Sequence, residues 1–162
     1  MITSGKPSPQ AVAKFLFDGQ HSPFTYRDPG TTRDGKAMDG YLELHNRVQL
    51  GKGEAAFNAA CAALKDWRMF DLGWVEVASP KPPLERGRVC GVMIRVFGLW
   101  WTNAARIVYT IDDNTGKTRR FGFAYGTLEE HAESGEERFL IEWNWNDDTV
   151  WYDLYSFSKP KH

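Results

Sequence analysis

The chain has 162 residues, of which 42% are hydrophobic and 25% charged, and its 20 basic and 21 acidic side chains give a net charge of −1. This balance argues against a broad basic surface for nucleic acid or anionic lipid. The length fits a single domain over residues 1–162 that needs no disulfide or metal to hold its core. Two cysteines without zinc-ligand spacing agree with that. We therefore expect no cofactor, no metal and no nucleic-acid partner.

The N-terminal residues lack the basic and apolar regions of a signal peptide. The most apolar stretch, residues 89–101, is interrupted by Arg95. It is too short for a membrane-spanning helix, which needs about 20 residues. We therefore expect a cytoplasmic protein with no membrane span.

The first predicted element is a helix over residues 9–19. Ser8 can cap it, Pro9 suits its first turn, and Gly19 is placed to end it. Residues 19–40 follow, with turn-forming residues throughout and no sustained period. A segment of that length without regular structure is typically either functional or loose.

Residues 42–50 alternate between apolar and polar side chains, with His45 among the polar ones. The pattern predicts a strand with one buried face, formed by Leu42, Leu44, Val48 and Leu50. The next stretch, residues 53–70, is rich in alanine and favours a helix. Its apolar residues recur at i, i+3, i+4 and i+7, namely Phe57, Ala60, Cys61 and Leu64.

The remaining sequence predicts six strands: one over residues 74–79, then 88–97, 104–112, 119–128, 137–146 and 149–158. Prolines mark residues 79–87 as a loop, and DDNTGK and NDD separate neighbouring strands as hairpin turns would. We expect an α+β fold in which a curved antiparallel β-sheet of six or seven strands wraps around the alanine-rich helix.

Aromatic residues alternate along the last three predicted strands. If their faces coincide, one side of the sheet is an aromatic wall that includes Phe123, Trp143 and Trp151. On the strand of residues 119–128 the opposite face carries Gly122 and Gly126. Such glycines indicate a bend, a closely packed helix, or a ligand lying against the backbone.

Five stretches of the sequence carry a family resemblance: YRDPGTTR, HNRVQLGKGEAAF, LKDWRMFDLGWV, FGFAYGTLEEHAESGEERF and VWYDLYSFSKP. In this order they resemble the bacterial and plant family called domain of unknown function 1990, over residues 26–160. The resemblance implies a helix-grip (START or Bet v 1-like) architecture, which commonly holds an apolar ligand between sheet and helix. Such folds normally end in a long closing helix, which we expect to be truncated or naturally absent here.

The acidic stretch of residues 129–136 contains His131 and Glu136. A carboxylate can orient an imidazole and shift its pKa, so these two residues, together with His45, are candidates for acid–base catalysis. The simpler interpretation is a solvated hairpin loop.

A second set of candidates, Arg33, Arg106 and Tyr125, suits the anionic end of a ligand, because an arginine fork matches a carboxylate or phosphate. The alternative is an arginine–glutamate network that ties strands together.

These features leave three functional hypotheses. The first is a protein that binds a small apolar or amphipathic molecule between sheet and helix. The second is an enzyme that uses the same cavity. The third is a protein-interaction module, in which a homodimer would cover an exposed aromatic surface.

Overall fold

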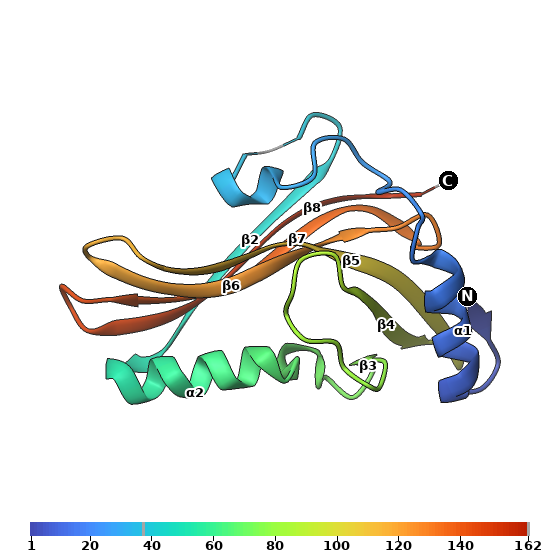
Figure 1. The fold of residues 1–162 in the computed structure, drawn as a ribbon, viewed down its shortest axis with the longest axis horizontal. Coiled ribbons are helices and arrows are strands. Elements are labelled where there is room, and N and C mark those ends of the chain that lie inside the picture. The colour runs from blue at the N-terminus through green and yellow to red at the C-terminus, as the bar shows by residue number, and fades with distance from the viewer. Residues whose placement is uncertain (37, 162) are drawn as a thin grey trace.

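One antiparallel β-sheet curls around a helix in the computed structural model, which describes residues 1–36 and 38–161. The strand order is β2-β8-β7-β6-β5-β4-β3, and β1 pairs with β5 off this path. The eight strands are β1 (Ile2–Thr3), β2 (Leu42–Lys52), β3 (Val75–Val77), β4 (Val89–Val96), β5 (Leu99–Asn114), β6 (Thr118–Thr127), β7 (Glu133–Asn144) and β8 (Thr149–Pro160). The predicted α+β class, a curved antiparallel sheet around a helix, is confirmed (Figure 1).

Both predicted helices are present. Helix α1 (Pro9–Gly19) begins after Ser8, whose hydroxyl oxygen accepts a hydrogen bond of 3.2 Å from the amide of Ala11. Helix α2 (Gly53–Lys65) follows β2 directly. Two short 3₁₀ helices, η1 (Thr31–Asp34) and η2 (Arg68–Phe70), complete the helical part. No helix in residues 1–36 and 38–161 is long and apolar enough to cross a membrane.

The main core lies between α2 and the sheet. Phe57, Cys61 and Leu64 of α2 are buried there, as the i, i+3, i+4 pattern predicts. Trp67, just beyond α2, is fully buried and packs against Phe123 with ring centres 4.9 Å apart. The interface between helix and sheet is therefore filled by packed side chains.

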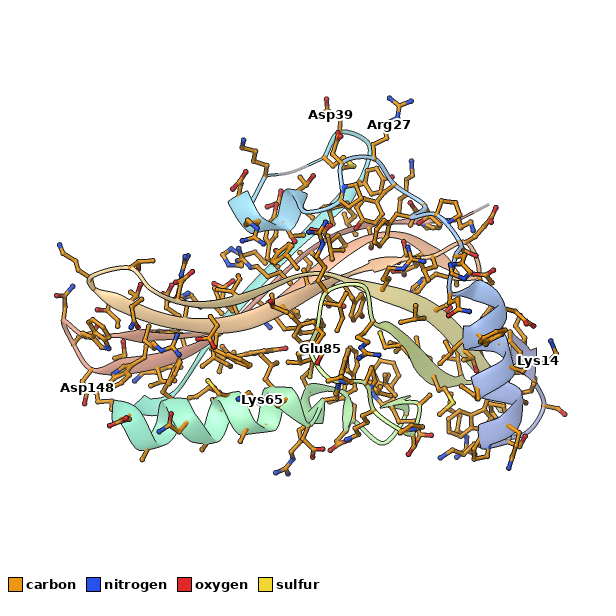
Figure 2. The ribbon with its side chains drawn as sticks, in the orientation of Figure 1. Lys14, Arg27, Asp39, Lys65, Glu85 and Asp148 are labelled. Carbon is orange, nitrogen blue, oxygen red and sulfur yellow. The ribbon has the colours of Figure 1, made fainter. Side chains whose placement is uncertain are left out.

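The opposite face of the sheet is covered by residues 20–36 and 38–41, the covering segment, which contains η1 (Figure 1). Arg27 and Asp39 lie at the outer tip of this segment and point away from the sheet (Figure 2). Residues nearer the sheet are anchored: Phe24 forms an isolated β-bridge with Leu128, and Thr32 is fully buried. The segment is thus a second cover for the sheet.

The largest differences from the sequence prediction are the starts of two strands and one additional strand. Strand β5 begins at Leu99 rather than Ala104, and β7 begins at Glu133 rather than Glu137. Strand β1 was not predicted, because two residues are too few for a detectable period. The early start of β7 shortens the predicted acidic loop and moves Glu136 from the loop into a strand.

The predicted buried face of β2 is wrong, although the strand itself is confirmed. Leu42, Leu44, Val48 and Leu50 are 79%, 53%, 47% and 49% exposed. The reason is position, because β2 is the outermost strand and pairs only with β8.

The glycines of β6 have structural explanations. A Cβ atom on Gly122 would overlap the backbone oxygen of Phe139 in the neighbouring strand. A Cβ atom on Gly126 would overlap the hydroxyl group of Tyr26, in the covering segment. Close approach of other parts of the chain therefore accounts for both positions.

Candidate functional site

Glu136 holds the covering segment on the sheet. Its side chain projects from β7 on the face away from α2, and the residue is only 2% exposed. One carboxylate oxygen accepts hydrogen bonds from the Tyr26 hydroxyl (2.7 Å) and the Gly30 amide (2.6 Å). The other accepts the Thr32 amide (3.0 Å) and the Thr32 hydroxyl. Four donors from one segment converge on this carboxylate, so it acts as an anchor.

Two arginines predicted from the sequence lie together beside the anchored segment. The guanidinium carbon of Arg33 lies 4.2 Å from the centre of the Tyr109 ring. That of Arg106 lies 5.2 Å from the centre of the Phe24 ring. Stacking on an aromatic face holds a guanidinium group in a fixed orientation while its N–H groups stay free to bind.

Arg86, from the proline-rich β3–β4 connection, lines the same groove. This groove has a volume of about 650 Å³ and runs along β5 between that connection and the covering segment. We call it the arginine groove; its lining includes Phe24, Arg33, Arg86, Arg106, Ile107 and Tyr109. The sequence did not indicate Arg86 as a site residue, because nothing local distinguishes it within an irregular loop.

Among the residues that the structure describes, the three arginines of the groove have no acidic partner. None of them forms an ion pair within 4.0 Å in the described part of the chain. Arg106 donates instead to the carbonyl oxygens of Gln20 (2.6 Å) and Ser22 (2.9 Å), both through Nη2. Its Nε and Nη1 hydrogens remain available, so the groove concentrates positive charge beside aromatic surface.

The aromatic wall exists only in part. Phe123 and Phe139 stack with ring centres 5.1 Å apart on the α2 face, and Trp143 lies 5.9 Å from Phe57 of α2. Trp151 was predicted to join them, and this is wrong. It pairs with Glu142, so it lies on the opposite face, where the guanidinium group of Arg47 covers its ring.

Tyr125 lies on the α2 face, away from the arginine groove, and it forms a separate pocket with Glu137. The Tyr125 hydroxyl donates a hydrogen bond of 2.6 Å to Oε2 of Glu137. This pocket has a volume of about 210 Å³ and also includes His131 and Ser156. We call it the Glu137 pocket. Glu137 was not proposed from the sequence as an acid–base residue, a role for which the sequence pointed instead to its neighbour Glu136.

The titratable groups of the Glu137 pocket are shifted by their surroundings. Burial raises the pKa of Glu137, against the effect of the hydrogen bond from Tyr125. Burial also lowers the pKa of His131 to about 4. The Nδ1 atom of His131 accepts a hydrogen bond of 3.0 Å from the amide of Glu133, so the neutral imidazole carries its proton on Nε2.

His45 belongs to neither site. Its Nε2 atom lies 3.0 Å from Asp153, which also accepts hydrogen bonds from Arg47 (2.9 Å) and Arg138 (2.7 Å). Burial of Asp153 opposes ionisation, but these hydrogen bonds outweigh it and lower the pKa of its carboxyl group. An arginine network thus ties β2, β7 and β8 together, but it centres on Asp153 and contains neither Arg33 nor Arg106, the arginines of the predicted alternative.

The structure thus separates the predicted site residues into distinct places. Arg33 and Arg106 share the arginine groove, and Tyr125 and His131 share the Glu137 pocket. His45 is in the Asp153 network. The predicted pairing of His131 with Glu136 is not observed, because the Glu136 carboxylate faces the covering segment.

Comparison with known proteins shows similarity over nearly the whole chain. The chain is 34% identical to a UPF0548 protein of Dictyostelium discoideum, over 100% of this chain and 82% of that protein. It is 36% identical to a UPF0548 protein of Deinococcus radiodurans, over 94% and 80%. A UPF0548 protein of Arabidopsis thaliana is 32% identical, over 99% and 83%.

One solved structure, the hypothetical protein jhp0584 from Helicobacter pylori, is similar with a TM-score of 0.46 and 13% identity, over 86% of this chain and 80% of that chain. The family model described as "Domain of unknown function (DUF1990)" matches residues 25–162. With that match and relatives above 30% identity, the chain belongs to the DUF1990 family.

Proposed function

We propose that the protein binds a small amphipathic anion in the arginine groove. The observation that carries this proposal is the stacking of Arg33 on Tyr109 and of Arg106 on Phe24, with no carboxylate paired to either arginine among residues 1–36 and 38–161. Guanidinium groups bind carboxylate or phosphate through paired N–H donors. The neighbouring rings offer apolar surface to the rest of the ligand.

The groove replaces the space between α2 and the sheet as the proposed binding place. Packed rings occupy that space, with Phe70 lying 5.6 Å from Phe139 and 6.2 Å from Tyr125 between ring centres. A ligand there would have to displace core side chains, whereas the groove is open.

Native mass spectrometry of gently purified protein tests the proposal. We expect a homogeneous added mass that disappears in the variants Arg33→Gln and Arg86→Gln. Arg68→Gln is the matched control, since Arg68 is exposed in η2 and does not line the groove. An added mass that survives in both groove variants contradicts the proposal, as does ligand-free protein that also fails to take up an added aromatic phosphate.

A second candidate function is proton transfer in the Glu137 pocket. It is favoured by the 2.6 Å hydrogen bond between Tyr125 and a Glu137 carboxylate that has no cation within 4.0 Å in the described residues. A carboxylate whose pKa is raised by burial is a stronger base than an ordinary carboxylate, which suits it to act as a general base. The Nε2–H of neutral His131 could donate a hydrogen bond to a substrate oxygen.

Deuterium exchange into a small ketone tests this second candidate. In D₂O, the Glu137 carboxylate would remove an α-proton from cyclopentanone, breaking the C–H bond, and a deuteron would then return to the enolate carbon. We expect the rate of exchange, measured by NMR, to be higher with the protein than in buffer alone. In Glu137→Gln we expect the rate to fall to that of buffer. Glu129 is exposed and does not line the pocket, so it gives the control Glu129→Gln. Equal rates for wild type and Glu137→Gln would exclude proton transfer by this carboxylate.

A further inference from the structure

Strand β2 presents an open edge that nothing in the described chain covers. It is the last strand in the sheet order and pairs only with β8. Every residue from 42 to 50 is exposed, which includes Leu44 at 53% and Val48 at 47%. Natural proteins usually protect such edges, because unpaired backbone groups and apolar side chains attract another strand.

The register of β2 with β8 shows on which face of the sheet each residue of β2 lies. Asn46 lies opposite Leu154 and Val48 opposite Tyr152, and both partners pack on the core beneath α2. Directly opposite residues share a face of the sheet, so the even-numbered residues of β2 lie on the α2 side. His45 and Arg47 lie on the other side, beside Asp153.

The sequence of β2 is complementary to itself when it is read antiparallel about Asn46. In that register Leu44 lies opposite Val48 of the partner subunit, which pairs two exposed apolar residues on one face. At the centre, Asn46 lies opposite Asn46 of the partner subunit, where the two side-chain amides can hydrogen-bond to each other.

On the other face His45 lies directly opposite Arg47 of the partner subunit, and each of them stays beside Asp153 of its own subunit. Glu43 lies opposite Gln49 of the partner subunit and diagonal to Arg47 of the partner subunit, and two-fold symmetry repeats this pair. The regular pairing with β8 is interrupted between Gln49 and Gly51, so the proposed pairing with a second β2 ends there too. It therefore spans residues 43–49.

We propose that two copies of the chain form a two-fold dimer by antiparallel pairing of their β2 strands, with Asn46 opposite Asn46 of the partner subunit. The pairing satisfies the open backbone edge of both copies and joins the two sheets into one. It is independent of ligand binding in the arginine groove.

Light scattering of the full chain over a range of concentrations tests association. We expect a dimer that dissociates on dilution, and a dimerisation constant at least tenfold weaker in Leu44→Lys. The matched control is Leu72→Lys, because Leu72 is a 56% exposed leucine outside β2. A monomer at every concentration overturns the proposal. The open edge of β2 would then pair with a segment other than a second copy of β2.

Disulfide cross-linking tests the register and does not depend on Leu44→Lys being folded. Asn46→Cys would place two thiols directly opposite each other, within the Cα separation of about 4.4–6.8 Å that a disulfide allows. Cys61 and Cys90 are buried. In Leu42→Cys the two thiols would lie about 26 Å apart along the strands, eight residues out of register.

We expect Asn46→Cys to form a covalent dimer on mild oxidation and Leu42→Cys to remain non-cross-linked. Equal cross-linking of both variants, or of neither in a protein that scatters as a dimer, contradicts the proposed register.

Discussion

Tyr26 and Glu136 connect the covering segment to the sheet through a hydrogen bond of 2.7 Å between the Tyr26 hydroxyl and a buried carboxylate oxygen. The same carboxylate accepts the amides of Gly30 and Thr32, which places Arg33 directly after the anchored residues. Arg33 then lies over Tyr109, whose hydroxyl is 2.7 Å from that of Thr32. The anchor and the arginine groove are therefore parts of one arrangement, and weakening the first should loosen the second.

Replacing Glu136 with Gln should destabilise the protein by about 2–4 kcal/mol, because charge-assisted hydrogen bonds are lost and an amide cannot accept all four donors. Denaturant unfolding measures this change. Hydrogen exchange should show faster exchange of the Gly30 and Thr32 amides, with no change in α2. Glu129→Gln, at an exposed position, is the control. Unchanged exchange at Gly30 and Thr32 would mean that Glu136 does not anchor the segment.

Gly126→Ala should displace Tyr26, because the added Cβ would occupy the position of its hydroxyl group. We expect a loss of about 1–3 kcal/mol in the free energy of unfolding, typical of overpacking at a buried site. Gly5→Ala serves as the control, since nothing lies within 4 Å of a Cβ at that position. Equal stability of the two variants would show that Tyr26 does not lie against β6.

The pKa of His131, about 4 against an ordinary value of 6.5, predicts a pH dependence of stability. Between these values the unfolded chain binds a proton that the folded chain does not, so folding is penalised increasingly as the pH falls from about 6.5 to 4. The penalty at low pH is at most about 3–4 kcal/mol.

The variant His131→Asn should reduce this pH dependence, because asparagine can accept the hydrogen bond from the Glu133 amide without titrating. Thermal unfolding of both proteins from pH 7 to pH 4 gives the comparison. Parallel curves would show that His131 titrates normally in the folded protein.

Asp153→Asn should cost about 3–5 kcal/mol at pH 7, since it leaves Arg138 without its carboxylate in a largely buried position. The pKa of Asp153 is lowered in the folded protein, so its contribution is present above about pH 4 and is lost as the pH falls through its folded pKa. The difference between wild type and variant should therefore shrink in acid. A difference that stays constant with pH would exclude the ion pairs as its source.

Local patterns predicted most of the fold. The i, i+3, i+4 stripe placed α2 correctly because one face of that helix meets the core and the other meets solvent. The same logic failed on β8, since both of its faces are covered. Leu154 packs toward α2, while Phe157 meets Tyr26 of the covering segment with ring centres 5.5 Å apart. Alternation cannot distinguish two apolar faces, so Trp151 was assigned to the wrong side.

The candidate site was predicted only in part, because local patterns do not show which residues the tertiary structure brings together. Arg33 and Arg106 were chosen for their chemistry, and tertiary structure brought them together. Glu136 and Glu137 are adjacent, and their roles depend on which face of β7 each occupies. Because the predicted strand began at Glu137 rather than Glu133, Glu136 was placed in a loop and assigned to neither face. Arg86 reaches the groove through an irregular loop, for which no periodic signal exists.

Calorimetric titration with phenyl phosphate tests the central claim, anion binding in the arginine groove, most directly. We predict saturable binding that weakens about tenfold in Arg33→Gln and in Arg86→Gln, as expected when a charge-assisted hydrogen bond worth about 1.4 kcal/mol is lost. Phenol should not bind, and Arg68→Gln should bind like wild type. No binding of phenyl phosphate at millimolar concentration, or equal binding by wild type and both groove variants, would contradict the account.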